Sequence, residues 1–177
     1  DEVQTGCGRT GKWFGYQHSD VVPDIITMAK ALGGGVAIGA MMASEEVASA
    51  LVPGKHASTF GGNALACAAA IAVIEAIEDD NLLDNAVEIG KYTREKLEQL
   101  GEKHAIIDHV RGAGLMIGVQ LTGEGSEIVN QCLEQGLRIN CTAGTVLRFM
   151  PPMIATKEHI DKAVAAFTKV GKELGVI

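Results

Sequence analysis

The chain has 177 residues and a formal net charge of −7 at pH 7, and 47% of its residues are hydrophobic. This length allows one domain or slightly more with a sizeable core, whereas the negative charge argues against nucleic acid and anionic membranes as partners. No apolar run is long enough to predict a transmembrane helix. The four cysteines are widely spaced without a CxxC pair, which predicts reduced thiols rather than a disulfide framework or a zinc site.

The first residues, D-E-V-Q, alternate and stop at Thr5-Gly6, which predicts the end of a strand entering a loop. Asp1 is then either a solvated strand end or an acid at the carboxyl tip of a strand, where α/β sheets bind ligands. Because a domain rarely begins at the end of a strand, and the chain does not begin with Met, we expect a C-terminal part of a longer protein.

Residues 5–24 are interrupted by glycine and proline around Trp13, Phe14 and Tyr16, which predicts a long ordered loop of the kind that is usually functional or packed at an interface. The letters of Gly6-x-Gly8-x-x-Gly11 match a dinucleotide-binding fingerprint. No apolar helix follows them, so we do not favour that function.

A single lysine, Lys30, follows the expected strand Ile25–Met28 and precedes three glycines, Gly33 to Gly35. Glycine lets a ligand or another chain approach the backbone closely. Among Ala, Met, Leu and Gly we expect the amine to be partly desolvated, which favours the neutral, nucleophilic form that Schiff-base chemistry needs. The alternative is a lysine that extends from a strand end into water, beside an ordinary glycine turn.

A second apolar run at 37–43 predicts a buried strand, and a short helix over 44–51 follows with Ser44 as its N-cap. The loop K-H-A-S-T-F-G-G-N spans 55–63 and ends in Asn63, the expected N-cap of the next helix. Ser58 and Thr59 beside that helix N-terminus form either a cradle for phosphate or carboxylate or a plain capped loop.

The helix over 64–78 is apolar almost all round and is expected to be buried, whereas the helix over 82–100 is amphipathic, with Val87 among the residues expected on its apolar face. This change places a domain boundary near 79–82, so we expect one domain over 1–80 and a second over 81–177.

The second domain is expected to be a small α+β layer. Its expected strands cover 106–110, 115–121, 137–140 and 146–150, its expected helices begin at Ser126 and after Thr156, and a turn or bulge lies at 111–114. Arg148 sits in the middle of a strand between Leu147 and Phe149. It is therefore either a receptor for an anion in a cleft or an edge residue that points outward.

Four stretches taken together, D-E-V-Q-T-G-C-G-R-T-G, P-D-I-I-T-M-A-K-A-L-G-G-G, H-A-S-T-F-G-G-N-A-L-A-C-A and V-L-R-F-M-P-P, resemble the class III (ornithine-type) aminotransferases that depend on pyridoxal 5′-phosphate (PLP). The resemblance implies an α/β chain comprising the C-terminal half of a fold type I (aspartate aminotransferase-like) large domain over 1–80, followed by the small α+β domain over 81–177. It covers the whole chain but only the C-terminal part of the family's length.

The resemblance also implies roles for individual residues. Lys30 would hold PLP as a Schiff base and later move a proton, and Asp1 would accept a hydrogen bond from the pyridinium nitrogen. Val3, expected on the same strand face as Asp1, would pack against the ring, and Gln4 would reach the ring hydroxyl.

Residues farther along the chain are given roles by the same resemblance. Thr59 would bind the PLP phosphate of the neighbouring subunit across a homodimer interface, and Ser58 would touch the substrate. Arg148 would bind a carboxylate of glutamate or 2-oxoglutarate in bidentate fashion.

The stretches H-A-S-T-F-G-G-N and I-N-C-T-A-G-T-V-L-R-F-M-P-P are most similar to members that act on N-acetylornithine. This implies transfer of its δ-amino group to 2-oxoglutarate, in a cytoplasmic homodimer of arginine biosynthesis, with ornithine, succinylornithine or 4-aminobutyrate as alternative donors. The family's own-subunit phosphate loop and ring-stacking aromatic residue lie before Asp1. A truncated domain without catalytic activity is therefore the other hypothesis, and we expect the isolated chain to be inactive.

Overall fold

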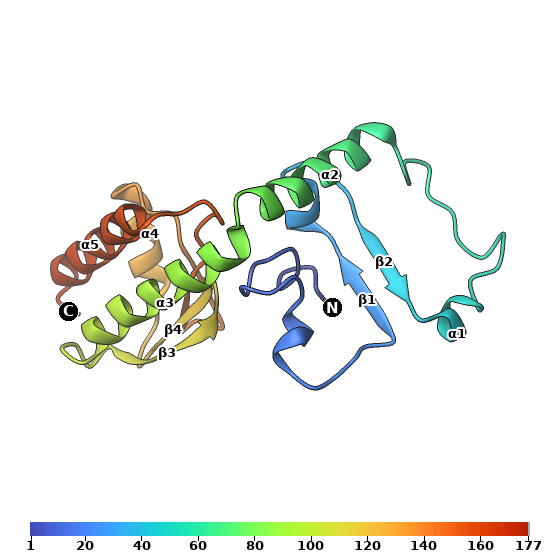
Figure 1. The fold of residues 1–177 in the computed structure, drawn as a ribbon. Coiled ribbons are helices and arrows are strands. Elements are labelled where there is room, and N and C mark those ends of the chain that lie inside the picture. The colour runs from blue at the N-terminus through green and yellow to red at the C-terminus, as the bar shows by residue number, and fades with distance from the viewer. Residues whose placement is uncertain (177) are drawn as a thin grey trace. The chain divides into compact units, whose positions relative to one another are not determined.

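The computed structural model describes residues 1–176, which divide into two compact units (Figure 1). Unit 1 comprises Asp1–Leu83, and unit 2 contains the described residues from Asp84 onward. No helix in the described part of the chain is both long enough and apolar enough to cross a membrane.

Unit 1 contains a two-stranded antiparallel sheet of β1 (Ile25–Met28) and β2 (Ala40–Ala43). The strands pair from Ile25 opposite Ala43 to Met28 opposite Ala40. The predicted strand at 25–28 is confirmed, and the predicted strand at 37–43 is shorter than expected. Its first residues belong instead to the connection that reverses the chain, where Gly34 and Gly35 have φ values of 58° and 112°, a backbone conformation that glycine adopts at little cost.

Four helical segments complete unit 1: η1 (Gly15–His18), η2 (Lys30–Gly33), α1 (Glu45–Ala48) and α2 (Ala64–Asp79). The predicted cap of α2 is confirmed, because the Asn63 side chain accepts a 2.9 Å hydrogen bond from the Ala66 N–H. The start of α2 is therefore fixed by a local interaction that the sequence encodes directly.

The predicted burial of α2 and of the 37–43 run is wrong in unit 1. α2 buries only Ala66, Ala70 and Ile77, while Leu65 is 73% exposed and Met41 on β2 is 50% exposed. Burial requires a surface to pack against, and a sheet of two strands offers a small one. An apolar composition predicts which residues favour burial but not whether a neighbour covers them.

Unit 2 contains a four-stranded antiparallel sheet in the order β3-β4-β6-β5. Its strands are β3 (Ile107–Ala113), β4 (Met116–Leu121), β5 (Asn140–Thr142) and β6 (Val146–Phe149). The expected turn at 111–114 is displaced, because β3 continues to Ala113. Gly112 permits this pairing: it has a φ of 141°, and a Cβ there would lie 2.1 Å from the Met116 carbonyl oxygen. The strand expected at 137–140 begins only at Asn140.

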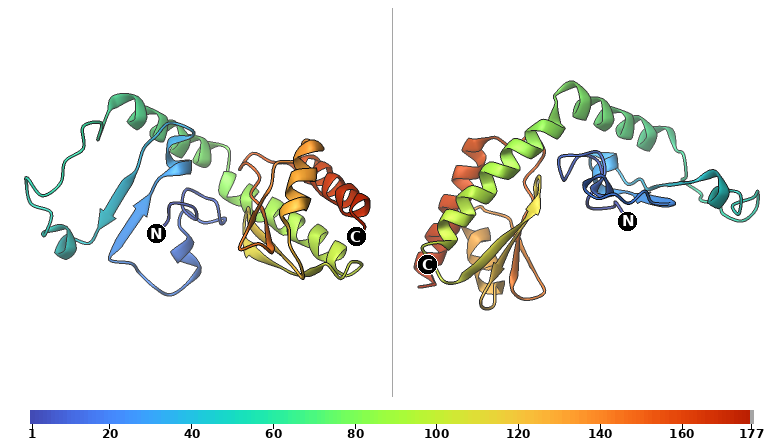
Figure 2. Two further views of the ribbon diagram at one scale, coloured as in Figure 1. Left: turned by 180° about the vertical axis from the view of Figure 1, so that it is seen from behind. Right: turned by 60° about the horizontal axis from the view of Figure 1, so that its bottom comes forward.

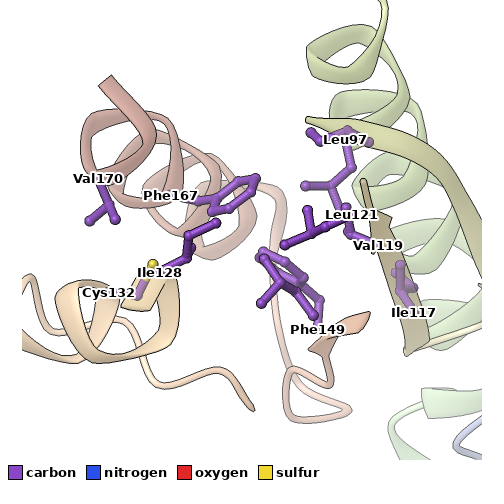
Figure 3. Close-up of a cluster of buried hydrophobic side chains, with 11 residues drawn as sticks. Leu97, Ile117, Val119, Leu121, Ile128, Cys132, Phe149, Phe167 and Val170 are labelled. Atoms are coloured by element: carbon purple, nitrogen blue, oxygen red, sulfur yellow. The ribbon is translucent and has the colours of Figure 1, made fainter. Parts of the chain in front are cut away.

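Three helices cover one face of this sheet: α3 (Leu82–Gly101, of which residues from 84 onward belong to unit 2), α4 (Ser126–Glu134) and α5 (Lys157–Glu173). Figure 2 shows α3 and α5 on the same side of the strands. Leu97, Phe149 and Phe167 meet in the core between them (Figure 3), and the two phenylalanine rings pack edge to face with centroids 5.6 Å apart. Val87, expected on the apolar face of α3, is 53% exposed, so that expectation is wrong.

Candidate active site

Lys30 is the first residue of η2, and a single residue, Ala29, separates it from the end of β1. Its side chain is exposed, and it forms no hydrogen bond or ion pair within residues 1–176. The expected partial desolvation is therefore wrong for this chain, because the apolar residues around Lys30 in the sequence do not enclose its amine. The amine is available to a ligand.

The backbone of Lys30 is in the left-handed region, with a φ of 45°. For an L-residue with a long side chain this conformation is uncommon and costs on the order of 1–2 kcal/mol. Strain of this kind is often found at functional positions, and here it lies at the predicted Schiff-base lysine.

Asp1 lies beside β1 rather than in a strand of its own. The Glu2 N–H donates a 2.9 Å hydrogen bond to the Thr27 carbonyl oxygen. The Asp1 carboxylate accepts through Oδ1 from the Val3 N–H at 2.9 Å and from the Thr27 hydroxyl at 3.2 Å. The expected strand over residues 1–4 is wrong, because the chain turns at Val3 and the Asp1 carboxylate satisfies the N–H of that turn.

Val3 and Gln4 both fall in this turn. The expectation that Val3 shares a strand face with Asp1 is therefore wrong, because alternating faces exist only in a strand. Val3 is half-buried and Gln4 is exposed. Asp1, Val3 and the end of β1 are nevertheless close together, as the contacts of Asp1 with Val3 and Thr27 require.

Glu2 is a structural residue to which the sequence analysis assigned no role. Glu2 is only 7% exposed. Its carboxylate accepts hydrogen bonds from the Thr5 hydroxyl and from the N–H groups of Gly15 and Tyr16, the latter two at 2.8 and 2.9 Å. Burial opposes ionisation of Glu2, but these hydrogen bonds and the positive N-terminus outweigh it, so its pKa lies below its ordinary 4.5. The acid directly before a glycine-rich loop, whose N–H groups need acceptors, was the available signal.

Ser58 and Thr59 lie in the exposed loop before α2. Ser58 lines a shallow cavity of about 460 Å³. Other lining residues come from the segment just before β2, such as Ile38, and from the segment just before α2, such as Gly61 and Asn63. Thr59 is not among the lining residues, and no hydrogen bond within residues 1–176 joins it to Lys30. Thr59 is thus exposed in this loop and has no polar contact with Lys30 within the described residues.

Arg148 belongs to unit 2 and lies in β6, between β4 and β5. The edge interpretation is therefore wrong, because an interior strand has a neighbour on each side. Its side chain is half-buried, on the face opposite Leu147 and Phe149, and its Nη2 lies 3.0 Å from the sulfur of Met150. Directly opposite Arg148 on β4 is Gly118, where an added Cβ would lie 3.3 Å from a Val146 methyl group.

Comparisons with known proteins give results consistent with these motifs. The family model described as "Aminotransferase class-III" matches residues 1–170. The chain is 55% identical over 174 residues to the acetylornithine aminotransferase of Methanocaldococcus jannaschii, covering 98% of the chain and 44% of that protein. It is 52% identical over 170 residues to that of Aquifex aeolicus, covering 96% of the chain and 43% of that protein. The chain thus spans less than half the length of these curated relatives.

Solved structures of aminotransferases are also similar to this chain, which again matches less than half of each of them. An acetylornithine aminotransferase from Elizabethkingia anophelis matches with a TM-score of 0.89 at 36% identity, over 97% of this chain and 44% of that one. The ornithine aminotransferase from Toxoplasma gondii matches with a TM-score of 0.91 at 36% identity, over 99% of this chain and 43% of that one. These likenesses confirm the predicted fold class, that of the fold type I PLP-dependent transferases.

Proposed function

The chain belongs to the class III aminotransferases, which are PLP-dependent enzymes, and from this premise we propose that it supplies the lysine-bearing part of an enzyme that transfers the δ-amino group of N-acetylornithine to 2-oxoglutarate. The curated relatives named for acetylornithine, at 55% and 52% identity, support this donor. Because the chain spans 44% of the first of these relatives, we assign the complete reaction to a full-length enzyme that contains these residues.

The observation that carries the proposal is the exposed, strained Lys30, which begins η2 two residues after β1, the strand whose Thr27 contacts the Asp1 carboxylate. This pairing fits PLP. A primary amine without a partner suits an aldehyde, and a carboxylate with one oxygen already held suits a pyridinium N–H.

When bound, PLP supplies an aldehyde that exchanges amines and a protonated ring that withdraws electrons from the substrate. Lys30 Nζ would hold the aldehyde carbon and then move the proton at the amine-bearing carbon of the substrate. Asp1 would hold the proton on the ring nitrogen, Val3 would pack on the ring, and Gln4 would contact its hydroxyl.

The remaining roles belong to recognition. We assign Thr59 to the cofactor phosphate of a neighbouring subunit, which its exposed position in the loop before α2 supports. Ser58 would contact the acetylated donor, and Arg148 would bind a substrate carboxylate. In this scheme residues 1–80 belong to the cofactor-binding domain and residues 81–177 to the small domain of a cytoplasmic homodimer.

Reductive trapping tests the Lys30 assignment in this chain. The chain is incubated with PLP and reduced with borohydride, and the modified lysines are located by peptide mass spectrometry. We expect preferential modification of Lys30, with loss of the Schiff-base absorption band in Lys30→Ala. Lys55→Ala is the matched control, because Lys55 is also exposed in unit 1. Equal labelling of Lys30 and Lys55, or an unchanged band in Lys30→Ala, contradicts the assignment.

Substrate choice is tested with the full-length enzyme. We expect kcat/KM for N-acetylornithine to exceed that for ornithine, succinylornithine and 4-aminobutyrate with 2-oxoglutarate as acceptor. A higher kcat/KM for any of those three donors would replace the proposed donor while leaving the family unchanged.

A further inference from the structure

The Thr27 hydroxyl lies against the carboxylate that we assign to the cofactor ring. Thr27 is the third residue of β1, paired with Met41 on β2, and its carbonyl oxygen accepts from the Glu2 N–H at 2.9 Å. Its hydroxyl donates to Asp1 Oδ1 at 3.2 Å. Two hydrogen bonds in opposite directions thus join this residue to the Asp1–Glu2 segment.

These contacts hold the Asp1 carboxylate asymmetrically. Oδ1 accepts from both the Val3 N–H and the Thr27 hydroxyl, whereas Oδ2 accepts no hydrogen bond from any residue in 1–176. With two donors on one oxygen, rotation of the carboxylate breaks at least one bond. The geometry therefore leaves one defined oxygen open for a further donor.

Threonine is suited to this task in a strand. Its branched Cβ restricts χ1, so a backbone fixed by the β1–β2 ladder and by the Glu2 contact also directs the hydroxyl. Donation to an ionised carboxylate favours the charged form, which is the form that can hold a proton on a ring nitrogen.

We infer that Thr27 is a positioning residue for Asp1, orienting the open oxygen Oδ2 toward the ring nitrogen of PLP. This inference rests on the proposed function, because it takes Asp1 as the residue that faces the ring. Thr27 does not touch the cofactor itself in this scheme.

The test uses the full-length enzyme loaded with PLP labelled with ¹⁵N in the ring, whose chemical shift reports protonation of that nitrogen. Thr27→Val keeps the shape and removes the hydroxyl, whereas Thr27→Ser keeps the hydroxyl. Asp1→Asn removes the charge. Thr168→Val is the matched control, because its hydroxyl bonds only to the Val164 carbonyl oxygen within α5.

We expect Thr27→Val to lower kcat about tenfold, the lower end for losing a hydrogen bond to a charged group, with KM little changed and the ¹⁵N shift moved toward the unprotonated value. Thr27→Ser should restore at least half of both, and Thr168→Val should match the unaltered enzyme. Thr27→Val with an unchanged ¹⁵N shift overturns the inference, whatever its kcat. If Asp1→Asn also leaves the shift and kcat unchanged, the assignment of Asp1 in the proposed function fails as well.

Discussion

Removing the charge of Glu2 tests how the N-terminal loop of unit 1 is held. The Glu2 carboxylate accepts from the Thr5 hydroxyl and from the N–H groups of Gly15 and Tyr16, across 13 and 14 residues of sequence. In Glu2→Gln the amide oxygen can still accept a hydrogen bond, but the amide NH₂ group takes the place of the second oxygen. Because NH₂ is itself a donor, it cannot accept from the N–H group that it faces.

The expected loss follows from these contacts. A hydrogen bond to a charged group contributes about 1.5–3 kcal/mol, and Glu2→Gln forfeits one such bond outright. We therefore expect the free energy of opening this loop to fall by about 2 kcal/mol at pH 7.

The effect should depend on pH in a defined direction. The pKa of Glu2 in the folded chain is lowered below its ordinary 4.5, so its charge stabilises the loop fully above the unfolded-state value. That stabilisation is lost as pH falls through the folded-state pKa. The difference between the unaltered chain and Glu2→Gln should therefore be full near pH 7 and shrink below about pH 4.5.

Trp13 provides the assay, because it is the single tryptophan of the chain and lies within the loop that Glu2 holds. Urea titrations followed by its fluorescence at several pH values give the loop's opening free energy. Glu75→Gln is the matched control, since Glu75 is exposed on α2. A Glu2→Gln curve that coincides with the control at pH 7, or a difference that is the same at pH 3 and pH 7, would refute the reasoning.

Two further predictions concern glycine and lysine backbones. Gly90→Ala in α3 should destabilise unit 2 by about 2 kcal/mol or more despite the better helix propensity of alanine, because a Cβ there would lie 2.1 Å from the Gly114 carbonyl oxygen. Gly101→Ala is the control, and urea titration by circular dichroism should show a much smaller effect for it, because the nearest atom there is an Ile107 methyl at 3.1 Å. Equal unfolding curves for the two variants would contradict this prediction. Lys30→Gly should stabilise unit 1 by about 1 kcal/mol, because glycine relieves the left-handed strain, and should abolish PLP trapping. Lys30→Ala should also abolish trapping but without the gain in stability. Equal melting temperatures for the two variants would argue against strain at this position.

The elements predicted well from sequence are those whose signals are local. Helix α4 was expected to begin at Ser126 and does so, because helical periodicity acts over a few residues. The Asn63 cap of α2 is of the same kind. The family motifs were also recognisable locally, since Lys30 and the glycines from Gly33 to Gly35 lie within one short stretch.

The features that failed depend on partners distant in sequence. Residues 1–4 were expected to form a strand, but the chain turns at Val3. Helix α2 is largely exposed although its composition favours burial. The burial of Glu2 depends in part on donors 13 and 14 residues away, Gly15 and Tyr16, and the glycine-rich loop after it indicated only that N–H groups there need acceptors. The roles of Thr59 and Arg148 stay predictions for the same reason: they concern surfaces that meet only in three dimensions.

The connection between β1 and β2 shows why the lysine position is informative. Reversing the chain there places Lys30 and Gly34, at the two ends of η2, in the left-handed region, with φ values of 45° and 58°. Glycine satisfies this requirement at no steric cost and serves at Gly34, yet a lysine stands at the other strained position. The left-handed backbone of this residue costs on the order of 1 kcal/mol, and its side chain forms no hydrogen bond or ion pair within residues 1–176 that would offset this cost. The proposed function accounts for this lysine, because in it the free amine binds the aldehyde of PLP.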